Sequence, residues 1–320
     1  VLDPALGTGT FLVEVIDIIH KTMTAKWQKA GHPSSKQQEL WNEYVPKHLL
    51  LRLYGFELLM APYAIAHMKI GLKLWETGYR FGSNERAHIY LTNSLEPPSD
   101  VQMDLPDLLP ALAHEAQAVN EVKRLKCFTV VIGNPPYSVS SVNKSNFIER
   151  EMEIYKEDVR SERNLQPLSD DYIKFIRFAH WNIDKANSGI SGMITNNTYL
   201  SGVIHRGMRR KLLDTFDEIY IPNLHGSLRI CEKTPDGKKD ENVFEIQQGV
   251  SIALLVKLEK PQKKGFITVI CGDREKRNTN TFLKTMRKEL SGKSWKLFPP
   301  TIFLSLKTLL RRMSIQNIGS

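Results

Sequence analysis

Hydrophobic positions along the chain alternate between short apolar runs and helical spacings. An apolar run at residues 1–4 ends at a proline, and apolar residues then recur at helical spacing from Phe11 to Met23. The same alternation predicts further helices over residues 37–51, 61–75, 172–182 and 206–216, and strands over residues 52–57, 87–91, 129–133, 189–195, 218–221 and 249–258. Residues 138–168 are polar and carry no predicted element. Alternating strands and helices predict an α/β fold with a mostly parallel sheet and helices on both faces.

A glycine turn joins the first strand to the first helix. Gly7 and Gly9 let the backbone turn tightly and let a ligand approach it, and the start of the helix offers free amides to a carboxylate. Glu57, at the end of the second strand, is a candidate acceptor for two ribose hydroxyls. Asn93, after the third strand, is a further candidate for contact with a cofactor adenine. The alternative interpretations are a plain tight turn, a solvated glutamate at a strand end, and a loop asparagine that supports a turn.

The fourth predicted strand runs directly into Asn134, Pro135, Pro136 and Tyr137. An aromatic amine is a poor nucleophile, and two acceptors on its protons, the Asn134 side-chain carbonyl and the Pro135 backbone carbonyl, restore electron density on its nitrogen. The prolines fix the backbone that aims these acceptors, in the manner of an inverted oxyanion hole. Tyr137 supplies a face for a stacked base. The alternative is a turn that ends a strand, with Tyr137 as a core aromatic.

These motifs resemble those of the amino-methyltransferases, with DPALGTG at residues 3–9, Glu57, and NPPY at residues 134–137 in that order. The resemblance implies a Rossmann-like fold that binds S-adenosylmethionine, with Asp3 and Ala5 joining the cofactor loop, and adenine N6 as the methyl acceptor. It implies double-stranded DNA with a flipped adenine as the partner.

Later segments narrow the resemblance to the type ISP restriction-modification enzymes. They are DDYIKFIR at residues 170–177, NNTYL at residues 196–200, KTPDG at residues 233–237 and DENVF at residues 240–244. The family joins a nuclease, a helicase-like ATPase, a methyltransferase and a target-recognition domain in one chain. Because the sequence starts inside a predicted strand, we expect an N-terminally truncated methyltransferase domain over residues 1–260.

Charge adds a candidate nucleic-acid face. Lys and Arg total 44 against 35 Asp and Glu, a formal charge of +9, and between Lys257 and Arg312 basic residues outnumber acidic ones fifteen to four. Residues 261–320 are therefore predicted to begin, or lead to, a target-recognition domain, with Lys284, Arg287 and Lys288 as candidate phosphate contacts. A merely solvated tail is the alternative.

Composition excludes several classes of protein. Hydrophobic residues make up 41% and charged residues 25% of the 320, typical of a globular chain, and no apolar run approaches the length of a membrane span. The three cysteines form no CxxC pair, so a reducing cytoplasm and no structural metal are expected.

Two other functions remain open from the sequence. A methyltransferase acting on protein glutamine or on RNA uses the same tetrapeptide on a planar amine, although the 134 − 9 = 125 positions between Gly9 and Asn134 favour a DNA enzyme. A non-catalytic DNA-binding remnant is the second.

Overall fold

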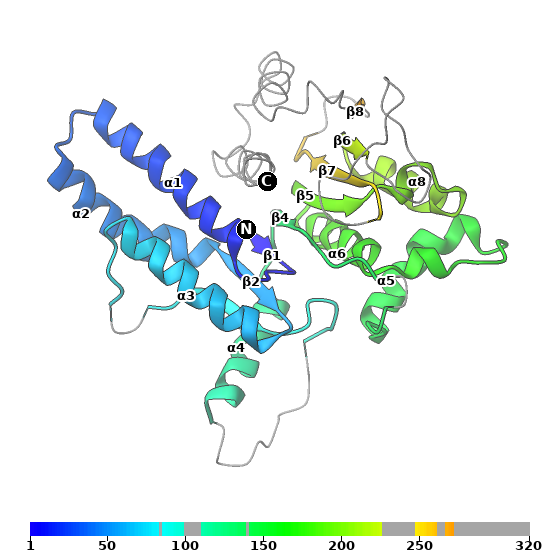
Figure 1. The fold of residues 1–320 in the computed structure, drawn as a ribbon, viewed down its shortest axis with the longest axis horizontal. Coiled ribbons are helices and arrows are strands. Elements are labelled where there is room, and N and C mark those ends of the chain that lie inside the picture. Colours follow the sequence, from blue (N-terminus) through cyan, green and yellow to red (C-terminus); the bar gives the residue numbers. More distant parts are fainter. Residues whose placement is uncertain (83–84, 99–109, 139–140, 226–246, 261–265, 272–320) are drawn as a thin grey trace. The chain divides into compact units, whose positions relative to one another are not determined.

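The computed structural model describes residues 1–82, 85–98, 110–138, 141–225, 247–260 and 266–271. They fall into two compact units, whose described parts are residues 1–126 and 127–271 (Figure 1). We call these unit 1 and unit 2. The predicted domain boundary at residue 260 stays a prediction. The strand over residues 266–271 lies beyond it and pairs within unit 2.

Unit 1 contains three parallel strands in the order β3-β2-β1. They are β1 (Leu2–Asp3), β2 (Tyr54–Glu57) and β3 (His88–Leu91). The helices are α1 (Thr10–Lys29), α2 (Ser34–Tyr44), α3 (Met60–Glu76) and α4 (Pro110–Leu125). Helices α1 and α3 run side by side (Figure 1). Strand β2 is buried at every residue, as expected of a strand that is covered on both faces.

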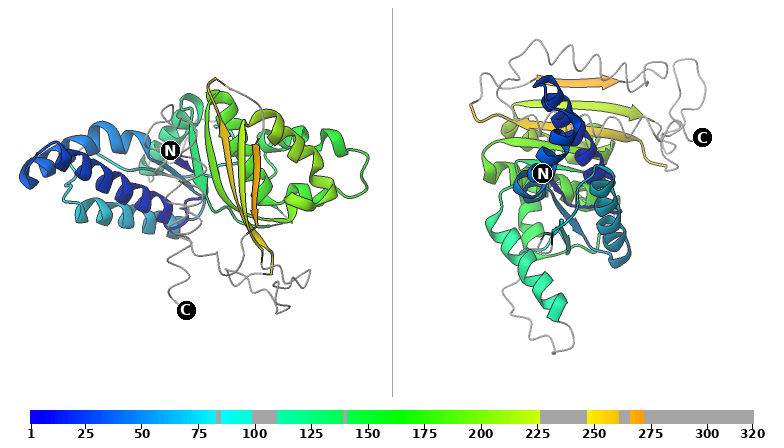
Figure 2. Two further views of the ribbon diagram at one scale, coloured as in Figure 1. Left: turned by 90° about the horizontal axis from the view of Figure 1, so that it is seen from above. Right: turned by 90° about the vertical axis from the view of Figure 1, so that its left-hand side faces the viewer.

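Unit 2 contains five strands in the order β4-β5-β7-β6-β8. They are β4 (Val130–Gly133), β5 (Gly189–Asn196), β6 (Glu218–His225), β7 (Val250–Lys257) and β8 (Phe266–Cys271). The pairs β4–β5 and β6–β8 are parallel, while β7 runs antiparallel to both β5 and β6. The helices are α5 (Asn146–Lys156), α6 (Asp171–Ala186), α7 (Thr198–Ser201) and α8 (Arg206–Thr215). Figure 2 shows α5, α6 and α8 on the same side of these strands.

The predicted elements are found, and the Rossmann-like α/β class with a mostly parallel sheet is confirmed. The predicted helix over residues 37–51 is divided, however, into α2, a π-helix (Val45–Leu49) and a 3-10 turn (Leu50–Arg52). Pro46 lies at the start of the π-helix and has no N–H to donate to the preceding turn, so the regular α-helical ladder is interrupted there.

No helix or strand was predicted over residues 138–168, and this was wrong, because α5 lies there. Ser145 caps α5 by accepting a 3.3 Å hydrogen bond from the Ile148 amide, and the helix buries Ile148, Met152 and Tyr155. The spacing of these three residues is helical, but the charged residues between them make the segment look like a loop. Helix α4 and strand β8 were also missed.

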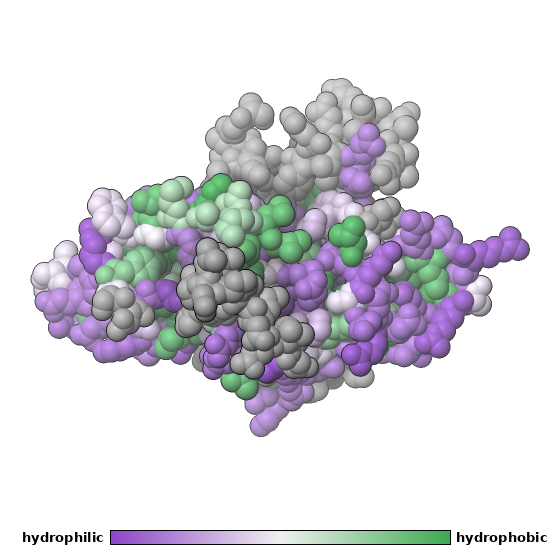
Figure 3. All heavy atoms as spheres, turned by 90° about the horizontal axis from the view of Figure 1, so that it is seen from below, coloured by the Kyte–Doolittle hydropathy of each residue, from purple (hydrophilic) through white to green (hydrophobic). Residues whose placement is uncertain are grey.

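Helix α3 leaves an apolar stripe exposed. Ile65, Met68, Leu72 and Trp75 recur at helical spacing and are between 40% and 59% exposed. Part of the hydrophobic surface in Figure 3 lies over the side of unit 1 that carries α3. None of the described helices is long and apolar enough to cross a membrane.

A buried histidine in the core of unit 2 predicts that the folded state loses stability as the pH falls. His180 is buried, with its Nδ1 3.0 Å from the Tyr155 hydroxyl and its Nε2 2.8 Å from Thr215 Oγ1. Burial lowers the pKa of His180 to about 3 from 6.5. The unfolded chain therefore takes up a proton below pH 6.5 that the folded chain takes up only near pH 3, and stability falls as the pH drops through that window.

We expect His180 to remove about 1.4 kcal/mol of unfolding free energy for each pH unit within the window. His205, whose pKa burial lowers to about 4, acts in the same direction. Denaturant titrations between pH 7 and pH 4 measure the slope. His180→Leu should unfold more readily at pH 7 but lose less stability on acidification, and an unchanged slope would contradict this assignment.

Candidate functional site

Glu57 ties the glycine loop to the end of β2. Its Oε2 accepts a 2.7 Å hydrogen bond from the Gly7 amide, and its Oε1 accepts a 2.8 Å bond from the Leu59 amide. The Leu6 amide also donates to the Phe56 carbonyl at 3.0 Å. The carboxylate predicted to bind ribose thus has a second task, because it fixes the loop predicted to bind the rest of the cofactor. Each oxygen keeps a further lone pair for a hydroxyl donor.

The two glycines of the loop serve different purposes. Both have positive φ, +56° at Gly7 and +77° at Gly9. A Cβ on Gly7 would meet no described atom within 4 Å, whereas a Cβ on Gly9 would lie 3.1 Å from the Ala66 Cβ of α3. A tight turn and the approach of a ligand were the predicted reasons for both glycines. The positive φ values agree with a tight turn, and at Gly9 the geometry adds a further reason, the close packing of α3 against the loop.

Lys69 of α3 also contacts this loop. Its Nζ lies 3.2 Å from the hydroxyl oxygens of both Thr8 and Thr10, at the start of α1. Asp3 ends β1 fully buried, and its Oδ1 accepts a 3.1 Å hydrogen bond from the Ala5 amide. Asp3 and Ala5, carried over from the family motif, therefore bond to each other at the base of the loop.

Asn93 closes a turn after β3. Its Oδ1 accepts from the Leu95 amide at 3.0 Å, and its Nδ2 donates to Glu96 Oε1 at 3.1 Å. Lys123 of α4 donates to the backbone carbonyls of Asn93 and Glu96 at 2.7 and 3.1 Å, and burial lowers its pKa to about 8. This geometry supports the turn role of Asn93, and its contact with a cofactor stays a prediction.

The tetrapeptide lies at the carboxyl end of β4 in unit 2. Asn134 and Pro136 are exposed, Pro135 is buried and Tyr137 is half-buried. The Tyr137 hydroxyl donates a long, 3.5 Å hydrogen bond to Asn134 Oδ1. The predicted acceptor oxygen is therefore at the surface of the unit and is oriented by its neighbour in the motif.

Tyr172 of α6 holds the ring of Tyr137. The two ring centroids are 5.8 Å apart with an interplanar angle of 80°, a T-shaped contact in which the edge of one ring meets a face of the other. Tyr172 therefore covers at most one face of the Tyr137 ring and does not cover the other. Tyr172 is only 2% exposed. Burial also raises the pKa of Tyr137, so its hydroxyl stays protonated and remains a donor at neutral pH.

Sequence reasoning missed several of these neighbours. Lys69, Lys123 and Tyr172 are separated from the motifs they contact by about 30 residues or more, and no local pattern announces such pairs. Leu58 was also missed. It directly follows Glu57 and is 58% exposed, an apolar side chain beside a polar acceptor.

Comparison with known proteins identifies the family. The Eco57I restriction-modification methylase family matches residues 53–227, more than half of the 320 residues. This chain therefore belongs to that family. A search of curated proteins finds no match to the sequence.

Solved structures similar to this chain include large restriction-modification enzymes. An ATP-dependent type ISP enzyme, LlaBIII bound to DNA, is 27% identical over 84% of this chain and 17% of its own, with a TM-score of 0.65. The DrdV–DNA complex is 25% identical over 84% of this chain and 24% of its own, with a TM-score of 0.60. The type ISP enzyme LlaGI, a nuclease-deletion mutant with a DNA substrate mimic, shares the fold at 22% identity over 90% of this chain and 22% of its own, with a TM-score of 0.68.

These similarities confirm the predicted resemblance to type ISP enzymes. The chain spans about a quarter or less of the length of each of these three proteins.

The loop geometry predicts different costs for alanine at the two glycines. Gly7→Ala should cost about 1 kcal/mol of stability, because only left-handed strain is added. Gly9→Ala should cost about 2 kcal/mol or more, because a Cβ there also presses on Ala66. Thermal unfolding of the two variants makes the comparison, and equal costs would mean that α3 yields freely at this contact.

Proposed function

We propose that this chain is the methyltransferase core of a DNA modification enzyme that methylates the exocyclic amine of a flipped adenine, using S-adenosylmethionine. The observation that carries the proposal is the exposed Asn134 at the end of β4, beside a Tyr137 ring that Tyr172 holds edge-on. Membership of a restriction-modification methylase family supports it.

The tetrapeptide is suited to activating an amine. The Asn134 side-chain carbonyl and the Pro135 backbone carbonyl accept the two amine protons and so oppose delocalisation of the nitrogen lone pair into the ring. As nitrogen forms its bond to the methyl carbon it gains positive charge, and both acceptors then bind more strongly, which is the condition for lowering a barrier. The methylated nitrogen carries a positive charge until one amine proton is released to solvent water, because an amide carbonyl is too weak a base to take that proton.

Unit 1 offers groups that fit the cofactor. The positive dipole end of α1 suits its carboxylate, the second lone pairs of Glu57 suit ribose hydroxyls, and the exposed Leu58 suits the face of a purine. The open space on the Cβ side of Gly7 leaves the loop backbone accessible. When bound, S-adenosylmethionine supplies a methyl group on a sulfonium sulfur. The sulfur leaves as a neutral thioether, which needs no metal or acid.

Duplex DNA is the proposed partner, because LlaBIII and DrdV are described in complexes with DNA. The predicted contacts Lys284, Arg287 and Lys288 lie outside the described residues and stay a prediction. We extend the proposal to a cytoplasmic enzyme in which this chain is fused to nuclease, ATPase and target-recognition domains.

Asn134→Ala tests the catalytic role. It removes one acceptor whose strength increases only in the transition state, so turnover should fall on the order of 100-fold while cofactor affinity is retained. The measurement is tritiated methyl transfer to DNA by the full-length protein, with digestion to nucleosides, and calorimetry for the cofactor. Label on cytosine, RNA or protein would refute the adenine proposal. Full activity in the variant would make the tetrapeptide an ordinary turn.

Tyr137→Ala tests the stacking role. Loss of the ring should weaken binding of an extruded base by roughly 1–3 kcal/mol, since a stacking partner is worth that much per base. Tyr137→Phe is the matched control: it keeps the ring and loses only the long bond to Asn134, so it should retain most activity. The fluorescence of 2-aminopurine at the target position reports the stacked state, and identical signals from both variants would exclude stacking on Tyr137.

A further inference from the structure

The N-terminal end of α6 buries three charged side chains. Asp170 is 3% exposed, Asp171 6% and Lys174 1%. Charged groups are buried only at considerable cost unless they are paired or hydrogen-bonded. Each of these three side chains has a hydrogen-bond partner on the segment from Ser138 to Glu149, which follows the tetrapeptide.

Ser138 is held at both of its backbone polar groups. Its N–H donates to Asp170 Oδ1 at 2.8 Å, and its C=O accepts from the Asp171 amide at 3.2 Å. A peptide bond joins Ser138 directly to Tyr137. The hydrogen bond from the Ser138 N–H therefore fixes the peptide group that carries Tyr137, and the bond to the Ser138 C=O holds the other side of Ser138.

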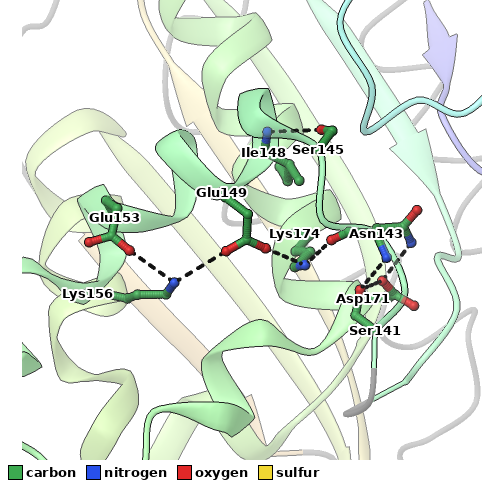
Figure 4. Close-up of polar contacts among 9 residues, drawn as sticks. All are labelled: Ser141, Asn143, Ser145, Ile148, Glu149, Glu153, Lys156, Asp171 and Lys174. Atoms are coloured by element: carbon green, nitrogen blue, oxygen red, sulfur yellow. Dashed lines mark hydrogen bonds and ion pairs between the residues drawn. The ribbon is translucent and has the colours of Figure 1, made fainter.

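Asp171 and Lys174 extend this attachment along the chain. Asp171 Oδ1 accepts from Ser141 Oγ at 2.6 Å and from Asn143 Nδ2 at 2.9 Å. Lys174 donates to the Asn143 carbonyl and, at 2.9 Å, to Glu149 Oε1 (Figure 4). The first turns of α6 thus hold residues 138, 141 and 143, although none of these lies within a helix or strand.

Asp170 occupies the N-cap position of α6, where an aspartate usually accepts from the first free amides of its own helix. Its carboxylate also interacts with the amides of Asp171 and Tyr172 in the first turn of its own helix. In addition it accepts from the Ser138 amide, which lies outside the helix. Helix capping alone therefore does not explain this carboxylate.

We propose that Asp170 is a positioning residue for methyl transfer: by holding the Ser138 amide it sets the Tyr137 ring, and through that ring the target base. Tyr172, two residues along, contacts the same ring edge-on, so α6 orients both the backbone and the side chain of Tyr137. This inference rests on the proposed function. Burial raises the pKa of Asp170, as expected of a carboxylate kept in a dry site.

The test is Asp170→Ala and Asp170→Asn in the full-length protein. Alanine removes the acceptor, so kcat should fall about 10- to 100-fold, the scale of a small misplacement of reacting groups, with cofactor affinity unchanged. The 2-aminopurine signal of the stacked base should fall with it. Asparagine keeps a carbonyl oxygen for the Ser138 amide and should restore both readouts.

The matched control is Asp184→Ala. Asp184 is an aspartate of the same helix that pairs with Lys257 at 2.6 Å and contacts no residue of the 138–143 segment in any described hydrogen bond. Its removal also deletes a carboxylate from α6, but kcat and the stacking signal should stay at wild-type values. An equal loss of kcat in Asp184→Ala and Asp170→Ala would overturn the positioning role, because it would reflect general loosening of the helix.

Amide hydrogen exchange separates this inference from the proposed function. Exchange in the peptide covering residues 134–145 should rise in Asp170→Ala and stay low in Asp170→Asn, whatever the substrate is. Unchanged exchange, or wild-type kcat in the alanine variant, overturns the inference. A wild-type protein that methylates no adenine overturns the proposed function, even where exchange confirms the contact between Asp170 and Ser138.

Discussion

A backbone amide that folding takes partly out of water needs an acceptor, and in both units a carboxylate supplies one to a loop at the end of a strand. Glu57 accepts from Gly7 and Leu59 in unit 1, and Asp170 accepts from Ser138 in unit 2. Loops of this kind make no regular ladder, so their part-buried amides would otherwise depend on water for a partner. The conformations of the glycine loop and of the segment after the tetrapeptide depend on these few bonds.

Because the same atoms fix a loop and lie beside the proposed chemistry, loss of activity alone does not assign a role. Replacing Glu57 removes acceptors from two amides as well as from a ribose. Replacing Asp170 disturbs a neighbour of the tetrapeptide and also the first turn of α6. A conservative variant that keeps a carbonyl oxygen, together with a binding measurement, distinguishes a lost contact from a loosened loop.

Aromatic contacts in unit 2 add a second constraint. The Tyr137 ring contacts the Tyr172 ring. The centroid of the Tyr172 ring in turn lies 6.3 Å from that of Tyr199, a buried residue of α7 after β5. Rings packed in this way have few alternative rotamers, since rotation of one collides with the next. The orientation of the half-buried Tyr137 ring thus depends on buried rings from α6 and from the segment after β5.

The local pattern of residues determined the alternating strands and helices, the glycine loop, and the tetrapeptide at the end of β4, because periodicity and glycine or proline chemistry act over a few neighbouring positions. It did not reveal α5, whose apolar stripe is interrupted by charged residues, nor the effect of Pro46, which divides one predicted helix. Only the tertiary structure decided that Gly9 packs on Ala66, that Lys123 holds the Asn93 turn, and that Asp170 accepts from Ser138. Each of these contacts joins residues about 30 or more positions apart, and their pairing is set by how the elements pack, which no local pattern encodes.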